Sequence, residues 1–150
     1  MSPPIKRVLF VCMGNACRSQ MAEAFARAYG QDALVAASAG LTPAVAVMPD
    51  TVRAMAEKEI DLRDQFPKSI RHLRSSQFDL VVNMTGLPLP DDIRAPIEEW
   101  SVPDPVGMDY EEHCEVRDQI ERLVMNLILK LRREQRAPRF RGQGSGRLKV

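Results

Sequence analysis

The sequence has few cysteines, few aromatic residues and no long apolar run, and each shortage excludes a class of protein. Its three cysteines are an odd number, and Cys12 and Cys17 lie close together, which favours thiol chemistry in a reducing compartment over a secreted disulfide framework. No apolar run is long enough to span a bilayer. The apolar stretch Val8–Met13 runs directly into Gly14-Asn15, so we expect no signal peptide, a cytoplasmic location and no membrane association.

Net charge and histidine are also scarce. A net charge of +1 argues against a general binder of polyanions. The two histidines, His72 and His113, have no companions at the spacing of metal ligands, so we expect no metal site. Basic residues dominate after Arg132, and we interpret residues 134–150 as a basic Arg/Gly-rich C-terminal tail. Such a tail could dock on nucleic acid or acidic lipid, but a plain soluble tail is the favoured interpretation and a nucleic-acid partner is not expected.

The sequence does contain alternating strand and helix patterns, in a chain of 150 residues that is 45% hydrophobic. Buried, β-branched runs predict four strands, at Ile5–Val11, Leu34–Ala39, Phe78–Met84 and Ile97–Val102. Apolar residues at helical spacing predict three helices, at Ser19–Tyr29, Asp50–Glu59 and Asp109–Arg133. Strands that alternate with helices indicate an α/β fold whose parallel sheet is covered on both faces. In such sheets ligands bind at the carboxyl ends of the strands.

The segment that follows the first strand has the chemistry of an oxyanion site. It reads Cys, five residues, Arg, Ser, from Cys12 to Ser19. A loop between a strand and a helix can aim several backbone N–H groups at one anion, and the helix dipole adds positive potential. Gly14 and Asn15 suit the positive-φ turns of such a ring. Arg18 offers a planar fork for two oxygens of a phosphate, and Ser19 could donate to the Cys12 sulfur.

Cys12 lies at the mouth of this loop, where the same potential would stabilise its thiolate as a nucleophile. The expected phosphate-binding residues are Met13, Gly14, Asn15, Ala16, Cys17, Arg18 and Ser19. The plain alternative is that Cys12 and Cys17 are buried structural thiols, as cysteines often are. The strand before the motif, the helix after it and the Gly-Asn pair inside it favour the functional interpretation.

These residues resemble a known family. The stretch VLFVCMGNACRSQMAEAFAR is similar to the opening of low-molecular-weight protein tyrosine phosphatases and of the arsenate reductases that share their fold. The resemblance continues through Ser38-Ala39-Gly40, Phe78-Asp79-Leu80 and Asp104-Pro105 to the final helix. It implies a three-layer α/β/α domain over residues 1–133, with a four-stranded parallel sheet and without metal or organic cofactor.

The resemblance also assigns an acid. In the family, the Asp of a matching Asp-Pro pair protonates the leaving group and later activates water, which makes Asp104 the candidate here. The alternative is a plain turn, because Pro103-Asp104-Pro105 is turn-like in any case. In the resulting mechanism the Cys12 thiolate attacks phosphorus, Arg18 and the loop hold the equatorial oxygens, and a phosphocysteine forms and is hydrolysed.

The sequence departs from both branches of the family. The phosphatases follow Asp-Pro with aromatic residues that grip phosphotyrosine, whereas here Val106-Gly107-Met108 follows. Pro67-Lys68-Ser69 resembles the reductase branch, but the cysteine pair that thioredoxin-coupled reductases carry after the third strand is absent. Cys17 could form a reversible disulfide with Cys12, and Cys114 is interpreted as structural or surface-lying.

Three functions therefore remain, in this order. The first is a phosphomonoester hydrolase of the low-molecular-weight tyrosine phosphatase type, acting on a phosphorylated protein or a small phosphomonoester. The second is an arsenate reductase that takes arsenate and an external thiol reductant. The third is a non-catalytic oxyanion-binding module, which would need neither the thiolate of Cys12 nor the acid of Asp104. The physiological substrate and the oligomeric state are left open.

Overall fold

The computed structural model describes residues 5–73 and 77–137 and contains one parallel sheet with helices. The elements in chain order are β1 (Lys6–Cys12), α1 (Arg18–Tyr29), β2 (Leu34–Gly40), α2 (Pro49–Ala56), the 3-10 helix η1 (Ile70–His72), β3 (Leu80–Asn83), β4 (Ile97–Glu99) and α3 (Tyr110–Arg136). The four strands are parallel and lie in the order β2-β1-β3-β4. The predicted α/β fold with a four-stranded parallel sheet is confirmed.

The register of the strands brings their carboxyl ends together. Cys12 at the end of β1 pairs with Gly40 at the end of β2, and Asn83 at the end of β3 pairs with Val11 and with Glu99. The loops that follow all four strands therefore leave from one edge of the sheet. This edge is where ligands bind in open parallel sheets.

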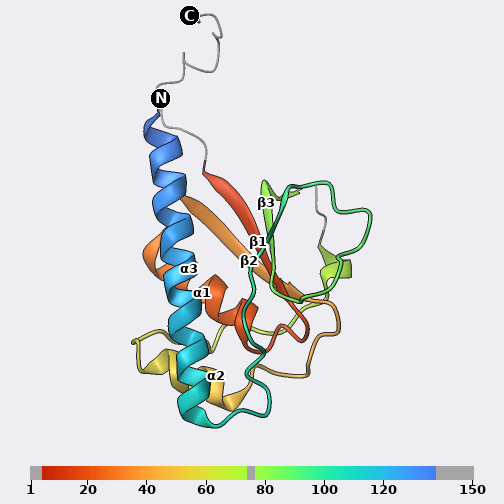
Figure 1. The fold of residues 1–150 in the computed structure, drawn as a ribbon, viewed down its shortest axis with the longest axis vertical. Coiled ribbons are helices and arrows are strands. Elements are labelled where there is room, and N and C mark those ends of the chain that lie inside the picture. Colours follow the sequence, from red (N-terminus) through yellow and green to blue (C-terminus); the bar gives the residue numbers. More distant parts are fainter. Residues whose placement is uncertain (1–4, 74–76, 138–150) are drawn as a thin grey trace, which may run out of the picture.

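The two faces of the sheet are covered differently (Figure 1). Helices α1, α2 and α3 lie on one face, where Val8 and Phe10 of β1 meet residues such as Phe25 and Ile120 in the larger core cluster. On the other face, Leu9, Val11 and Val81 pack against Ile70 of η1 and against apolar residues of loops. Among the described residues, this face is thus covered by η1 and by loops.

Several predicted elements differ from the structure at their ends. β3 and β4 are shorter than expected, and α3 runs to Arg136, beyond the predicted domain end at Arg133. Most of the predicted tail, residues 138–150, lies outside the described residues. Within the part of the chain that is described, no helix combines the length and apolar character that crossing a bilayer requires.

Candidate active site

The loop between Cys12 and Arg18 is held from outside by the segment 41–48 that follows β2. Amides of this segment donate to four loop carbonyls: Leu41 to Cys12 (3.2 Å), Thr42 to Met13 (2.8 Å), Ala44 to Gly14 (2.9 Å) and Met48 to Ala16 (3.1 Å). A fifth carbonyl, that of Asn15, accepts from the buried Gln20 side chain at 2.9 Å. The loop carbonyls are therefore turned outward.

This arrangement turns the N–H groups of the loop inward. In a trans peptide the N–H and the C=O point in opposite directions, so each outward carbonyl leaves the next residue's N–H facing the inside of the loop. Within residues 5–73 and 77–137, no group accepts a hydrogen bond from the backbone N–H of Gly14, Asn15, Ala16 or Cys17. A ring of free N–H groups at the start of a helix is an anion site.

One sequence expectation for the loop is wrong. Gly14 does not take a positive φ, whereas Asn15 does, with φ 51°. A β-carbon on Gly14 would meet its neighbours at ordinary contact distances of 3.8 to 3.9 Å. The left-handed turn falls on Asn15 because its side chain is fixed in the site, where Oδ1 accepts from the Lys68 amide (2.9 Å) and Nδ2 donates to Ser19 Oγ (2.7 Å).

The same contacts orient donors toward the sulfur of Cys12. Ser19 Oγ lies 2.9 Å from Cys12 Sγ, and the Ser19 backbone N–H donates to the same sulfur at 3.4 Å. Since Asn15 Nδ2 donates into Ser19 Oγ, the hydroxyl proton of Ser19 is left to donate to the sulfur. Two donors, together with the N-terminus of α1, are thus directed at the Cys12 sulfur.

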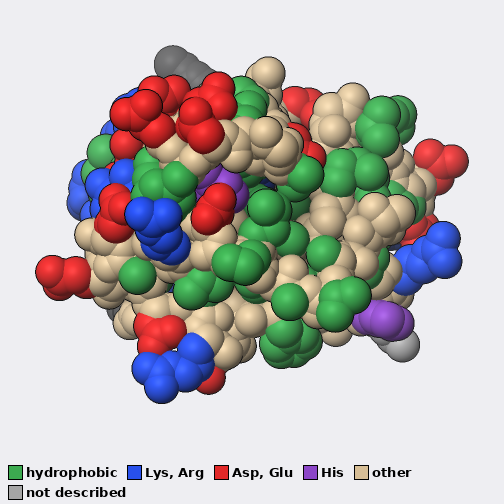
Figure 2. Space-filling model, turned by 90° about the horizontal axis from the view of Figure 1, so that it is seen from below, with side chains coloured by type: hydrophobic (Ala, Val, Ile, Leu, Met, Phe, Trp, Pro, Cys, Tyr) green, Lys and Arg blue, Asp and Glu red, His purple; other side chains and the backbone are tan. Residues whose placement is uncertain are grey.

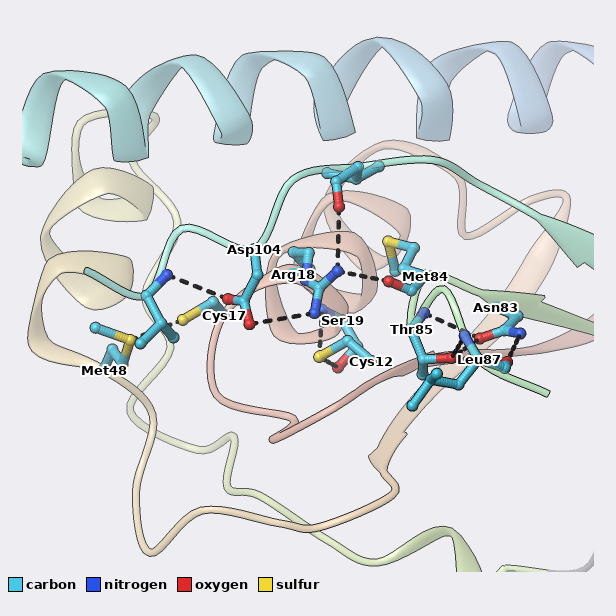
Figure 3. Close-up of polar contacts among 12 residues, drawn as sticks. Cys12, Cys17, Arg18, Ser19, Met48, Asn83, Met84, Thr85, Leu87 and Asp104 are labelled. Carbon is cyan, nitrogen blue, oxygen red and sulfur yellow. Dashed lines mark hydrogen bonds and ion pairs between the residues drawn. The ribbon is translucent and has the colours of Figure 1, made fainter. Parts of the chain in front are cut away.

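Arg18 connects the loop to the ends of β3 and β4 (Figure 3). Its side chain is almost fully buried, and Nη1 donates to the Met84 carbonyl at 2.5 Å and to the Val102 carbonyl at 3.1 Å. Nη2 lies 3.5 Å from Asp104 Oδ2. The structure therefore brings together the three residues that the sequence predicts as catalytic: Cys12, Arg18 and Asp104.

Asp104 lies on the loop between β4 and α3 and is about half exposed, at 47% of its side chain. Its Oδ1 accepts from the Val106 amide at 3.1 Å, which fixes one carboxylate oxygen in a turn, while Oδ2 faces Arg18. Asp104 therefore closes a turn and also directs one carboxylate oxygen toward Arg18, while its role as an acid stays a prediction.

The other two cysteines are not placed as second nucleophiles. Cys17 is buried, its thiol donates to Met48 Sδ at 2.9 Å, and burial raises its pKa to about 11. It is therefore a neutral thiol near pH 7, which is a poor nucleophile. Cys114 is a half-buried residue of α3. The hypothesis that Cys17 forms a disulfide with Cys12 stays a prediction, to be checked by a mass shift under mild peroxide that Cys17→Ser abolishes.

The turn after β3, residues 83–87, contains no cysteine pair and is instead held by hydrogen bonds of the Asn83 side chain (Figure 3). Asn83 Nδ2 donates to the Leu87 carbonyl (2.8 Å) and to Glu99 (3.2 Å), and Asn83 Oδ1 accepts from the amide and the hydroxyl of Thr85 (3.0 and 2.7 Å). This closed network fixes the turn against β4.

Sequence reasoning missed several residues that build the site. The carbonyls of Met84 and Val102 hold Arg18, and carbonyls carry no signal in a sequence. Gly40 allows the loop to approach β2, since a β-carbon there would lie 2.8 Å from the Met13 oxygen and 2.9 Å from the Asn15 nitrogen. The sequence singles out Ser38-Ala39-Gly40 only through the resemblance, which implies no such role.

Comparisons with known proteins agree with this geometry. The family model of low molecular weight phosphotyrosine protein phosphatases matches residues 7–89. A glutaredoxin arsenate reductase of Synechocystis is 36% identical over 85% of this chain and 99% of its own, and an arsenate reductase of Staphylococcus xylosus is 36% identical over 83% and 98%.

Solved structures give the same result. An arsenate reductase in a phosphate-binding state has a TM-score of 0.79 at 35% identity, over 85% of this chain and 99% of its own. An arginine phosphatase from Geobacillus stearothermophilus has a TM-score of 0.77 at 25% identity, over 87% and 95%. The chain belongs to the low molecular weight phosphotyrosine protein phosphatase family.

Proposed function

We propose that this enzyme reduces arsenate to arsenite through Cys12, with an external thiol as the reductant. The observation that carries the proposal is the 36% identity to proteins named arsenate reductases along almost their whole length. This reverses the order of the first two functions inferred from the sequence. The absence of an aromatic grip after Asp104-Pro105 also supports a small inorganic substrate over phosphotyrosine.

The first step is attack on arsenic. The Cys12 thiolate forms the S–As bond, one As–O bond breaks, and Asp104 protonates the oxygen that leaves as water. Arg18 and the inward N–H groups of the loop hold the remaining oxygens, as they would hold a phosphate. The resonance-stabilised guanidinium suits this role because Nη1 is anchored on carbonyls and Nη2 faces the site.

The second step needs another thiol. An external thiolate attacks the Cys12 sulfur, an S–S bond forms, and the electron pair of the S–As bond stays on arsenic, which leaves as arsenite. A second external thiol then cleaves the mixed disulfide and restores Cys12. The net reaction converts arsenate and two thiols into arsenite, one disulfide and water.

The proposed reductant is external because the turn after β3 holds no cysteine pair and Cys17 is not a reactive thiol. The turn 83–87 holds no cysteine, and Cys17 is buried as a neutral thiol. The name of the Synechocystis relative points to glutaredoxin as a protein of the right chemistry. We therefore propose glutathione together with a glutaredoxin as the reductant.

The test is arsenate-dependent oxidation of NADPH in the presence of glutathione, glutaredoxin and glutathione reductase. We expect turnover in the wild type and in Cys114→Ser, none in Cys12→Ser, and a glutathione adduct on Cys12 by mass spectrometry when glutaredoxin is omitted. Turnover that survives in Cys12→Ser, or an enzyme inert to arsenate with all three components present, would contradict the proposal.

Phosphomonoester hydrolysis is the second candidate, favoured by the position of Asp104 beside Arg18 and by the likeness to an arginine phosphatase. Here the same attack leaves a phosphocysteine, and Asp104 serves first as acid and then as base. The mouth of the site supports small or apolar esters, because Val45, Leu87 and Val106 are exposed on the loops that follow three strands. Figure 2 shows the lower end of the molecule, where hydrophobic side chains cover much of the surface.

Hydrolysis of p-nitrophenyl phosphate between pH 5 and 7 tests this candidate. We expect Cys12→Ser to abolish the rate and Asp104→Asn to lower it roughly 100-fold, in line with the usual contribution of a general acid. An Asp104→Asn variant with the wild-type rate would remove Asp104 from the mechanism. Absence of both activities in the wild type would leave the non-catalytic oxyanion module.

A further inference from the structure

The peptide bond between Met84 and Thr85 is held from both sides. Its carbonyl oxygen accepts from Arg18 Nη1 at 2.5 Å, and its N–H donates to Asn83 Oδ1 at 3.0 Å. The two groups belong to one rigid plane and point in opposite directions. Rotation of this plane would therefore break both hydrogen bonds together, so the acceptor on Asn83 fixes the direction of the carbonyl that Arg18 uses.

The side chain of Asn83 is itself held in place, so it can fix the direction of the Met84 carbonyl. It is almost fully buried, and its Nδ2 is bound to the Leu87 carbonyl and to Glu99 of β4, which sets the orientation of its amide. Its bond to the amide two residues ahead is an Asx-turn, a local contact that a serine hydroxyl can also form. The ladder continues on both sides, because the Met84 amide donates to Val11 and the Trp100 amide donates to Asn83.

We propose that Asn83 is a positioning residue for Arg18, acting through the Met84–Thr85 peptide plane to hold the guanidinium in its anion-binding direction. This inference rests on the proposed function in so far as both need an oxyanion in the loop. The resemblance would place thiols in this turn of a thioredoxin-coupled reductase, whereas here the turn orients the Met84 carbonyl that accepts from Arg18. In this proposal Asn83 acts through Arg18 and not on the substrate.

The experiment measures how inorganic phosphate protects Cys12 from alkylation by iodoacetamide, with the labelled cysteine located by fragmentation of the Val8–Arg18 peptide. Asn83→Ala and Asn83→Ser form a matched pair, because they differ only in the hydroxyl that can accept from the Thr85 amide. We expect phosphate affinity to fall about tenfold in Asn83→Ala and to stay within about threefold of wild type in Asn83→Ser, as for one hydrogen bond that orients a charged group.

If Asn83 had a merely structural role, the phosphate affinity of Asn83→Ala and Asn83→Ser would change by the same factor. Equal protection by phosphate in folded Asn83→Ala and Asn83→Ser would therefore overturn the inference. If Asn83→Ala does not fold, Asn83→Gln takes its place, since it keeps the amide and displaces its oxygen by one methylene. Wild-type protection in Asn83→Gln would also overturn the inference, and a loss like that expected for Asn83→Ala would support it.

Failure of the proposed function gives a different result. If phosphate does not protect Cys12 in the wild type, the loop binds no tetrahedral oxyanion. Both the proposed function and the role of Asn83 are then contradicted. If phosphate protects the wild type but arsenate is not reduced, only the proposed reaction falls, and the comparison of Asn83→Ala with Asn83→Ser still decides the role of Asn83.

Discussion

Gly40 shows how one residue without a side chain can set the geometry of the anion loop. A methyl group at this position would lie 2.8 Å from the Met13 oxygen and 2.9 Å from the Asn15 nitrogen, both of them backbone atoms that cannot move without the loop. We expect Gly40→Ala to lower turnover at least about tenfold and to destabilise the protein by about 1–3 kcal/mol, as overpacking does. Activity and urea unfolding measured on the same preparation check this, and wild-type turnover would contradict it.

Glu59 stores backbone strain away from the site. It adopts a φ of 62° just beyond the end of α2, in a region that a side chain disfavours and glycine does not. We expect Glu59→Gly to raise the free energy of unfolding by about 1 kcal/mol. Urea unfolding measures it, with Ala56→Gly at the helix end as the control that should instead lose stability. A destabilised Glu59→Gly would show that the Glu59 side chain contributes more than its strain costs.

At the residue level, side-chain chemistry could be read from the sequence, and backbone geometry could not. The motif spacing predicted Cys12 and Arg18 in one site, the resemblance added Asp104, and the structure brings Asp104 beside Arg18. The positive φ was expected at Gly14 as well as Asn15, but it falls on Asn15 alone, because side-chain contacts from Ser19 and Lys68 decide it. Those partners become neighbours only after folding.

At the scale of the element, α3 begins with a capping box directly after the loop of Asp104. Asp109 Oδ1 accepts from the Glu112 amide at 2.8 Å, and Glu112 accepts from the Asp109 amide at 3.2 Å. We expect Asp109→Ala to lower the free energy of unfolding by about 1 kcal/mol, as for other N-cap losses. Chemical denaturation measures it, and Glu111→Ala, in the first turn but outside the box, is the matched control that should change stability less.

The length of a strand cannot be predicted from the residues of that strand alone, as β4 shows. The sequence predicts a strand over Ile97–Val102, yet β4 ends at Glu99. Among the described strands β4 pairs with β3, which ends at Asn83, and the Trp100 amide donates to the Asn83 carbonyl just beyond the paired residues. Beyond that point β3 has no further residue paired with β4, and the Trp100 ring packs on Phe10. The point at which a strand ends thus depends on where its neighbour ends, which is a property of the sheet.

At the scale of the whole molecule, the alternation of strands and helices predicted a sheet covered on both faces, and the resemblance implied that helices flank it. The helices gather on one face because α1 and α3 present continuous apolar stripes, while the other face is closed by η1 and by apolar residues scattered through loops. Scattered residues have no period, so pattern analysis leaves them as loop.

Stability of the whole molecule should depend on pH through His113. This residue of α3 is completely buried, its Nε2 is hydrogen-bonded to Thr51 Oγ1 of α2 at 2.9 Å, and burial lowers its pKa despite the smaller opposing effect of Asp50 and Asp104. Unfolded His113 takes up a proton near its ordinary pKa of about 6.5, whereas the folded residue does so only at lower pH. The unfolded state therefore binds more protons as pH falls below 6.5, and stability is lost in that direction.

The loss should approach ~1.4 kcal/mol per pH unit between the unfolded and folded pKa of His113, the value for one proton. Denaturation followed from pH 7.5 to pH 5 measures it in wild type, His113→Gln and His72→Gln. The His113→Gln amide can keep the bond to Thr51 without titrating, so its slope should flatten. His72 is exposed, so His72→Gln should keep the wild-type slope. A wild-type slope in His113→Gln would place the pH dependence on the carboxylates, because the buried imidazole would then contribute no proton uptake on unfolding.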